Sequence, residues 1–298
     1  MSASNSEHPR EEKSSIFTKR KGRFTHKDAQ GRSVTVWYQV PHAAKTQPVT
    51  VLFVMHGIQR NAKEYRDVWV KQQADVQEKT KHSLVPLLVL APEFDKDTFP
   101  DIDQYILGNV YDSDKRKQNH TSEWSFWIIE SIFDQVLDTY TAAPLNPTYV
   151  LFGHSAGAQF VHRFVLFMPS APLSATRPTS EQSADKKAVS TVASASTAGA
   201  PVKQQTFPRF SIAISANSGF YTMPHFKAKF PYGLELTEHS SDALAAALGR
   251  RMLVLLGDAD TDPNHKSLRR TAGAMEQGQH RFERGQNFFK AGQAATQS

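Results

Sequence analysis

The chain of 298 residues contains no cysteine, which excludes disulfide bonds and thiolate metal sites. It also lacks any apolar run close to the roughly 20 residues that a membrane-spanning helix needs. The N-terminal stretch has no apolar segment of the kind found in secretory signals, and its Glu7, Glu11 and Glu12 are untypical of a transit peptide. These absences predict a soluble, cytoplasmic protein with no membrane span.

Positive charge is in excess, but it is not arranged as a binding stripe. The formal net charge is +6, and the dense basic run comprises Lys19, Arg20, Lys21 and Arg23. In the rest of the chain no stripe of lysine and arginine interleaves with aromatic residues, so we expect no nucleic-acid partner. The composition of residues 1–22 predicts a disordered basic tail.

A second segment, residues 172–206, has no aromatic residue and consists mostly of serine, threonine, alanine, lysine and glutamine. Such a segment cannot bury enough apolar surface to offset the entropy lost on ordering. We therefore predict a low-complexity insertion within one domain that spans residues 23–298. With 39% hydrophobic residues, the chain has enough apolar side chains for a single large core.

Strands and helices are expected to alternate along this domain, after a hairpin at residues 23–41. Asn61 and Ser122 are the expected N-caps of the first two helices. The alternation predicts an α/β fold, with a mostly parallel central sheet and helices on both faces. The expected strands and helices are, in order, VTVLFVMHG (49–57), NAKEYRDVWVKQQADVQEK (61–79), LVPLLVLAPEF (84–94), SEWSFWIIESIFDQVLDTY (122–140), TYVLFG (148–153), AGAQFVHRFVLFM (156–168), RFSIAISAN (209–217) and RRMLVLLG (250–257).

The pentapeptide GHSAG, residues 153–157, stands between an expected strand and an expected helix, as a nucleophile elbow requires. A tight turn there would lift the Ser155 hydroxyl out of the sheet, while Gly153 and Gly157 keep side chains away where backbones crowd. The backbone N–H of Ala156 would face the oxygen that becomes negative during acyl transfer. The alternative is a tight turn that happens to contain serine, but the context favours a nucleophile.

A second donor for that oxygen is expected in MHGIQRN, residues 55–61, at the end of an earlier strand. The His-Gly pair permits a sharp turn, so that the backbone N–H of Ile58 can face the same point. Arg60 either orients substrate or fixes the loop. We expect His56 and His154 to be structural hydrogen-bonding residues rather than catalytic groups.

The segment LLGDADTDP, residues 255–263, follows a buried strand and offers three carboxylates at its C-terminal end. Asp258, Asp260 and Asp262 are all candidates for the acid of a triad, and Asp260 is our choice. The alternative is loop capping by short carboxylates. A calcium loop of the EF-hand type would need a glycine and a glutamate at later positions that this sequence does not supply, so we expect no metal and no other cofactor.

Aromatic residues supply the candidates for a substrate pocket. Phe220 and Tyr221 follow the C-terminal end of an expected strand, where open α/β sheets bind ligands. Trp124 and Trp127 are weaker candidates, because their spacing is that of core aromatics. We therefore predict that Arg60, Phe220 and Tyr221 line the substrate pocket.

Several stretches resemble α/β-hydrolase-fold serine esterases similar to poly(3-hydroxybutyrate) depolymerases. The resemblance implies that Ser155 attacks an ester carbonyl and that Asp260 orients a histidine that takes the serine's proton. It also implies that the N–H groups of Ile58 and Ala156 stabilise the oxyanion. The matching stretches, from about Val54 to Gly285, are VMHGIQRNAKEYRD, EWSFWIIESIFD, GHSAGAQFVHRFVLFMP, SANSGFYTMP, PYGL, LLGDADTDP and LRRTAGAMEQGQHRFERG.

In that family the catalytic histidine lies on a Gly-His turn after a last strand. This sequence ends at NFFKAGQAATQS, and after Asp260 it contains only His265 and His280. His265 is too close to Asp260 in sequence to arrive from a separate strand, and His280 falls in a segment that the family has in addition to its usual histidine. We therefore expect a C-terminally incomplete hydrolase fold without this strand and base.

Two functions follow from these observations. The first is a serine hydrolase that cleaves a small-molecule or polymeric carboxylic ester through an acyl-enzyme intermediate, and a peptidase or thioesterase would share its site. The second is a catalytically impaired hydrolase-fold protein or binding protein, because the triad histidine segment is absent.

Overall fold

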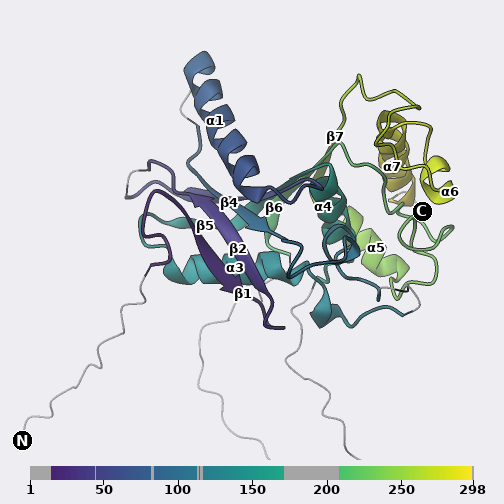
Figure 1. Ribbon diagram of the computed structural model, residues 1–298, viewed down its shortest axis with the longest axis horizontal. Helices are drawn as coiled ribbons and strands as arrows, with labels where there is room; N and C mark the ends of the chain where they lie inside the picture. Colours follow the sequence, from purple (N-terminus) through teal and green to yellow (C-terminus); the bar gives the residue numbers. More distant parts are fainter. Residues whose placement is uncertain are drawn as a thin grey trace, which may run out of the picture.

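The computed structural model describes residues 15–43, 45–81, 84–112, 114, 117–170 and 208–296. They form a seven-stranded sheet in the order β1-β2-β4-β3-β5-β6-β7 (Figure 1). β2 pairs antiparallel with β1 and β4, and every pair from β4 through β7 is parallel, which confirms the mostly parallel α/β sheet. The strands are β1 (Lys21–Lys27), β2 (Ser33–Gln39), β3 (Val49–Met55), β4 (Leu87–Glu93), β5 (Leu145–His154), β6 (Phe210–Ala216) and β7 (Met252–Leu255).

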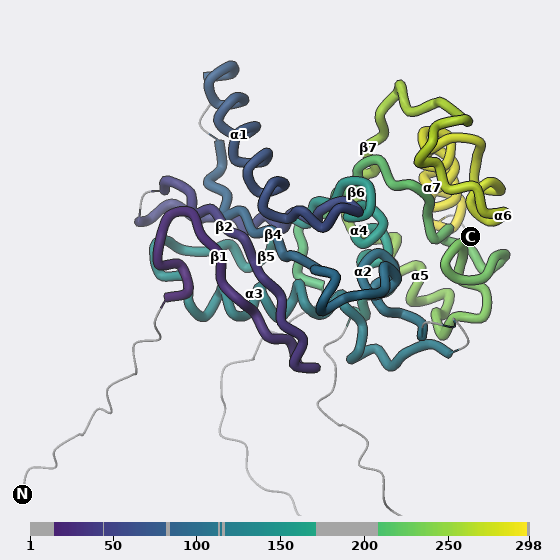
Figure 2. Tube along the Cα trace, in the orientation of Figure 1, coloured from purple at the N-terminus to yellow at the C-terminus, as the bar shows by residue number. Residues whose placement is uncertain are grey.

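Helices cover the two faces of this sheet unequally. α1 lies on one face, whereas α3 and α4 lie on the other (Figure 1). α7 lies beside the β7 end of the sheet (Figure 2). None of the helices in the described ranges is both long and apolar enough to cross a membrane. The helices are α1 (Ala62–Thr80), α2 (Asp103–Ile106), the 3-10 turn η1 (Thr121–Glu123), α3 (Trp127–Thr139), α4 (Ala156–Phe167), α5 (Ser241–Leu248), α6 (Ala272–Met275) and α7 (Arg281–Ala295).

The central strand β3 shows why its sequence does not alternate between apolar and polar residues. Val54 belongs to a small core beneath α1, together with Ala62 of that helix. Phe53 points the other way, into the large core that α3 and α4 complete with Ile132 and Phe160. Because both faces of β3 are buried, nearly every position in the strand is apolar.

The α1 face of the sheet is covered only in part. Phe152 of β5 pairs in register with Ile214 of β6, which pairs with Leu253 of β7, so these three side chains share one face. Phe152 and Ile214 are half-buried, and Leu253 and Leu255 are each 47% exposed. The apolar surface on this face therefore continues past α1 to the edge strand.

The predicted basic tail is too long at its C-terminal end. β1 begins at Lys21, and Phe17 packs edge-on against Phe24 and Tyr38. A single aromatic side chain thus anchors a segment whose overall composition is polar. The rest of the predicted tail, and the predicted insertion at 172–206, lie outside the described residues.

Of the two expected N-caps, one is confirmed in position and the other is wrong. Asn61 occupies the N-cap position of α1, but its side chain makes no capping hydrogen bond. Ser122 lies in η1, and α3 starts only at Trp127. Ser125 explains the late start, because its N–H donates to the Gly108 carbonyl and its hydroxyl to the Gln104 carbonyl of α2, which holds this stretch against α2 and the residues after it.

Candidate active site

Ser155 occupies the single-residue turn between β5 and α4. Its φ of 57° and ψ of −112° lie in a region that residues with a side chain rarely adopt. Its N–H donates to the carbonyl of Ala216, the last residue of the neighbouring strand β6, at 3.0 Å. The serine is half-buried. Such backbone strain persists only where the surrounding structure enforces it, so the turn requires specific neighbours.

Those neighbours are close backbone contacts at Gly153 and Gly157. A Cβ atom on Gly153 would lie 2.2 Å from the carbonyl oxygen of Gly157. A Cβ atom on Gly157 would lie 2.2 Å from the carbonyl oxygen of Met55, at the end of β3. The predicted crowding of backbones at these two glycines is therefore confirmed. It presses the start of α4 against the loop that follows β3.

The backbone N–H groups of Ile58 and Ala156 are both free of hydrogen bonds to the residues that the structure describes. Ala156 is the first residue of α4, where the N–H of a helix has no partner within the helix. Ile58 lies in the loop after β3, and its side chain is 57% exposed. β3 and β5 are parallel neighbours, with Met55 opposite Gly153, so both loops leave the same edge of the sheet.

His56 supports the loop that contains Ile58. Its Nδ1 donates to the Gly57 carbonyl at 2.9 Å, and its Nε2 accepts from the Phe94 N–H at 3.0 Å. The Tyr105 hydroxyl donates to the His56 carbonyl at 2.7 Å. Burial lowers the pKa of His56 to about 4, so the ring is neutral at physiological pH. This buried ring agrees with the expected structural role.

Arg60, the predicted substrate-pocket residue of the same loop, is buried. Its guanidinium donates to the carbonyls of Phe94 and Asp95 and lies over the Tyr105 ring, 5.5 Å from the centroid. Burial lowers its pKa from the ordinary value. Of the two predicted roles, these contacts match loop fixation, and a role in orienting substrate stays a prediction.

Asp260 follows β7, and the structure brings it to the same sheet edge as Ser155. β5, β6 and β7 are adjacent parallel strands, and Asn217 connects the ends of the last two. The N–H of Asn217 donates to the Leu255 carbonyl at 2.9 Å, and the Oδ1 of Asn217 accepts from the Gly257 N–H at 2.7 Å. The Asp260 carboxylate is half-buried, whereas Asp258 and Asp262 are exposed.

The Asp260 carboxylate forms an ion pair with Arg281, the first residue of α7, at 2.8 Å. The other guanidinium nitrogen of Arg281 contacts His265 Nδ1 at 3.1 Å. His280 caps α7 by accepting the Glu283 N–H. Within the described ranges, neither histidine hydrogen-bonds to Ser155 or Asp260. Arg281 is a contact that the sequence did not predict.

Phe220 and Tyr221, the other predicted pocket residues, are buried. Phe220 is 2% exposed and lies between two guanidinium groups, those of Arg163 and Arg269, at 4.8 and 4.7 Å from its ring centroid. Tyr221 is fully buried and stacks on Phe288 with ring centroids 4.5 Å apart. Their role in a substrate pocket stays a prediction, because in this arrangement both rings pack against protein.

Tyr65 is a further residue that the sequence analysis did not single out. It lies on α1, and its hydroxyl is 3.3 Å from Nδ1 of His154, the residue before Ser155. Both side chains line an open cavity of about 550 Å³ beside α1, together with Val68, Trp69 and Phe152. Its position in the first turn of the helix that follows the His-Gly loop is the signal that could have identified it.

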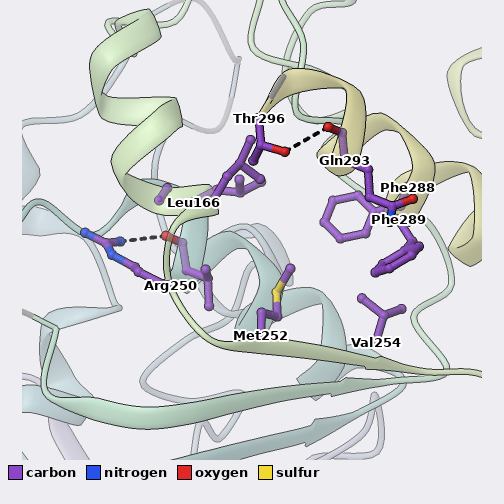
Figure 3. A pocket seen from close by; sticks show the side chains of 12 residues that line it. Leu166, Arg250, Met252, Val254, Phe288, Phe289, Gln293 and Thr296 are labelled. Carbon is purple, nitrogen blue, oxygen red and sulfur yellow. Dashed lines mark hydrogen bonds between the residues drawn. The ribbon is translucent and has the colours of Figure 1, made fainter. Parts of the chain in front are cut away.

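A second cavity, of about 230 Å³, lies between α4, α5, α7 and β7 (Figure 3). Arg250, just before β7, donates to the Val165 carbonyl at its wall at 2.7 Å, and Phe288 and Phe289 extend from α7. Arg250 precedes β7 whereas Asp260 follows it, so this cavity lies at the opposite end of the strand from the carboxylate. Among the described residues no group of acidic or histidine side chains has the arrangement of a metal site.

Comparison with solved structures places this geometry among known hydrolases. The chain is similar to poly(aspartic acid) hydrolase-1 from Sphingomonas sp. KT-1, with 34% identity and a TM-score of 0.72 over 93% of this chain and 86% of that one. It is also similar to LpqC, a poly(3-hydroxybutyrate) depolymerase from Bordetella parapertussis, with 26% identity and a TM-score of 0.68 over 93% of this chain and 78% of that one. No protein-family model matches the chain, and no curated protein matches it either.

Proposed function

The chain belongs to the family of α/β-hydrolase-fold enzymes that includes poly(aspartic acid) hydrolase-1, and from this membership we propose that it is a serine hydrolase. The structural neighbours support a hydrolase of ester-like substrates. The observation that carries the serine mechanism is the Ser155 turn, with its positive φ of 57° between β5 and α4. A serine held in this way is a nucleophile elbow.

In the proposed reaction the Ser155 hydroxyl attacks the carbonyl carbon of a carboxylic ester and forms an acyl-enzyme intermediate. The free N–H groups of Ile58 and Ala156 stabilise the negative oxygen of the tetrahedral intermediate. The base that accepts the proton of the serine and passes it to the leaving alcohol is a histidine oriented by Asp260, and the histidines that follow Asp260 in this sequence are His265 and His280. Water then hydrolyses the acyl-enzyme by the same route.

The proposed substrate is a small-molecule or polymeric ester. Both similar hydrolases are named for polymers, poly(aspartic acid) and poly(3-hydroxybutyrate), which supports a polymeric substrate for this chain as well. Ser155 is half-exposed and the loop at Ile58 is exposed, so a polymeric ester can reach both.

The ion pair between Asp260 and Arg281 favours a second candidate, a catalytically impaired protein with the hydrolase fold. The guanidinium of Arg281 occupies one oxygen of this carboxylate, and among the described residues no histidine contacts the other oxygen. In this candidate the same surface binds an ester without turning it over.

The two candidates are separated by labelling and turnover. We expect a fluorophosphonate probe to label the folded wild type at Ser155, and a short-chain nitrophenyl ester to be hydrolysed. Ser155→Ala should abolish labelling and lower kcat by roughly 10³- to 10⁶-fold, whereas Ser267→Ala, in an exposed loop, should leave both unchanged. Asp260→Asn should lower kcat by roughly 10⁴-fold.

A folded wild type that is neither labelled nor active would overturn the serine-hydrolase proposal and support the impaired protein. Circular dichroism in the far and near ultraviolet establishes that each variant is folded.

A further inference from the structure

Tyr65 connects the two loops that meet at the proposed site. It lies on α1, and its hydroxyl is 3.3 Å from Nδ1 of His154. The same hydroxyl lies directly against the backbone of Gly57. Gly57 precedes Ile58, the proposed oxyanion donor, and His154 precedes Ser155, the proposed nucleophile. One phenol oxygen therefore contacts the residue before each of them.

The contact with Gly57 is close enough to exclude a side chain there. A Cβ atom on Gly57 would lie 2.6 Å from the Tyr65 hydroxyl oxygen. Glycine is therefore needed at this position for the approach of the phenol as well as for the turn of the loop. The α1 helix fixes the ring, because Tyr65 packs in the small core beneath α1.

Burial raises the pKa of Tyr65, so its hydroxyl keeps its proton, and burial lowers the pKa of His154, so its ring is neutral. A hydrogen bond between a phenol and a neutral imidazole therefore joins α1 to the β5 turn, and the same phenol oxygen contacts the β3 loop at Gly57.

Gly57 is held from two directions. The Tyr65 hydroxyl packs against it, and its carbonyl accepts from His56 Nδ1 at 2.9 Å and from the Arg60 N–H at 3.2 Å. In a trans peptide the N–H of the next residue points opposite to the carbonyl. Fixing the Gly57 carbonyl therefore fixes the direction of the Ile58 N–H.

We propose that Tyr65 is a positioning residue that holds the Gly57–Ile58 peptide in place relative to the Ser155 turn through its close contact with Gly57 and its hydrogen bond with His154. This inference rests on the proposed serine-hydrolase function for its catalytic consequence, but the link itself is independent of activity. Tyr65 acts through Gly57 and His154 and does not touch the substrate.

The experiment compares Tyr65→Phe with Tyr111→Phe. Tyr111 also donates its hydroxyl to a backbone carbonyl, that of Leu236, at 3.1 Å, but it lies outside the proposed site. Both variants lose one phenol hydroxyl. Because Tyr65 and His154 line an open cavity, water can reach the groups that Tyr65→Phe leaves behind, so this variant should fold.

We expect Tyr65→Phe to lower kcat for a nitrophenyl ester by roughly 10- to 100-fold with KM changed less than about twofold, since a misplaced N–H weakens only transition-state binding. The rate of fluorophosphonate labelling should fall by a similar factor. Tyr111→Phe should leave kcat, KM and labelling at wild-type values. Unchanged kcat in Tyr65→Phe, or an equal loss in both variants, would overturn the catalytic role.

Amide hydrogen exchange tests the link without any turnover. The amide of Gly57 should exchange faster in Tyr65→Phe than in the wild type, and at the wild-type rate in Tyr111→Phe. Equal exchange in all three proteins would refute the proposed link. Faster exchange together with an unlabelled, inactive wild type would instead confirm the link and refute the serine-hydrolase proposal.

Discussion

At the scale of single residues, the strained Ser155 turn depends on the absence of side chains at Gly153 and Gly157. Both glycines have negative φ, so conformational freedom is not the reason for them. The reason is the approach of backbone to backbone, because an added Cβ would lie 2.2 Å from a carbonyl oxygen in either case. Backbone atoms cannot rotate away as the tip of a side chain can.

Gly157→Ala should therefore destabilise the protein by about 1–3 kcal/mol, because α4 has to move away from Met55. Gly292→Ala is the matched control. Gly292 lies inside α7, and its added Cβ would meet only Leu248 at 3.8 Å, an ordinary contact. The control should gain about 0.5–1 kcal/mol from the higher helix propensity of alanine.

The measurement is the free energy of unfolding from urea titration followed by circular dichroism. An unfolding free energy of Gly157→Ala as high as that of the control variant would show that the crowding at the turn is relieved without cost. The Ser155 labelling rate should fall in Gly157→Ala, since the same movement displaces the start of α4.

At the scale of elements, a buried ionic cluster joins α3 to β5 and to the start of β6. Glu130 of α3 accepts from the Tyr149 hydroxyl at 2.6 Å and from the Arg209 backbone N–H at 2.8 Å. Its other oxygen accepts from Arg209 Nε at 2.7 Å. Arg209 also pairs with Asp134, whose side chain is 61% exposed. The carboxylate of Glu130 thus has a partner for each oxygen.

Arg209→Ala should cost about 3–5 kcal/mol of unfolding free energy, because it leaves the Glu130 charge buried without its cation. Asp134→Ala removes the exposed partner of the same arginine and should cost at most about 1 kcal/mol. Thermal or urea unfolding of both variants provides the comparison. Similar losses of unfolding free energy in the two variants would contradict the idea that burial decides how much each ion pair contributes to stability.

The elements themselves were predicted well where a local pattern specifies them. The apolar runs of β3 and β5 and the period of α4 appear in the sequence, and the structure confirms them with boundaries shifted by a few residues. The start of α3 was predicted too early, at Ser122, because the contacts that delay it come from Gln104 of α2 and from Gly108 just after that helix. Periodicity carries no information about such partners.

At the scale of the whole molecule, buried neutral histidines make stability depend on pH. His56 and His162 are both fully buried, and each uses one ring nitrogen as a donor and the other as an acceptor. Burial lowers the pKa of His56 to about 4 and that of His162 well below its usual value. In the unfolded chain both have the ordinary pKa of 6.5.

Since the unfolded state binds protons more readily than the folded state, stability is full above about pH 6.5 and falls as the pH decreases towards about 4. Each histidine contributes up to about 1.4 kcal/mol per pH unit within this window. Urea unfolding at several pH values measures the slope of the unfolding free energy against pH. His162→Gln should reduce this slope by the equivalent of up to one bound proton. A constant unfolding free energy across the window would contradict this expectation.

By itself, the sequence determined the order of the strands, the helices α1, α3 and α4, and the tight turn at Ser155, whereas α2, α5 and α6 were not among the expected elements. The features that it determined follow from neighbouring residues, because apolar spacing and small residues act on the local backbone. Only the tertiary structure decided that Tyr65 reaches His154, that Arg281 pairs with Asp260 and that Phe220 is enclosed by two arginines. Such contacts join residues far apart in the chain, and no local pattern specifies which side chains will meet once the sheet brings its strand ends together.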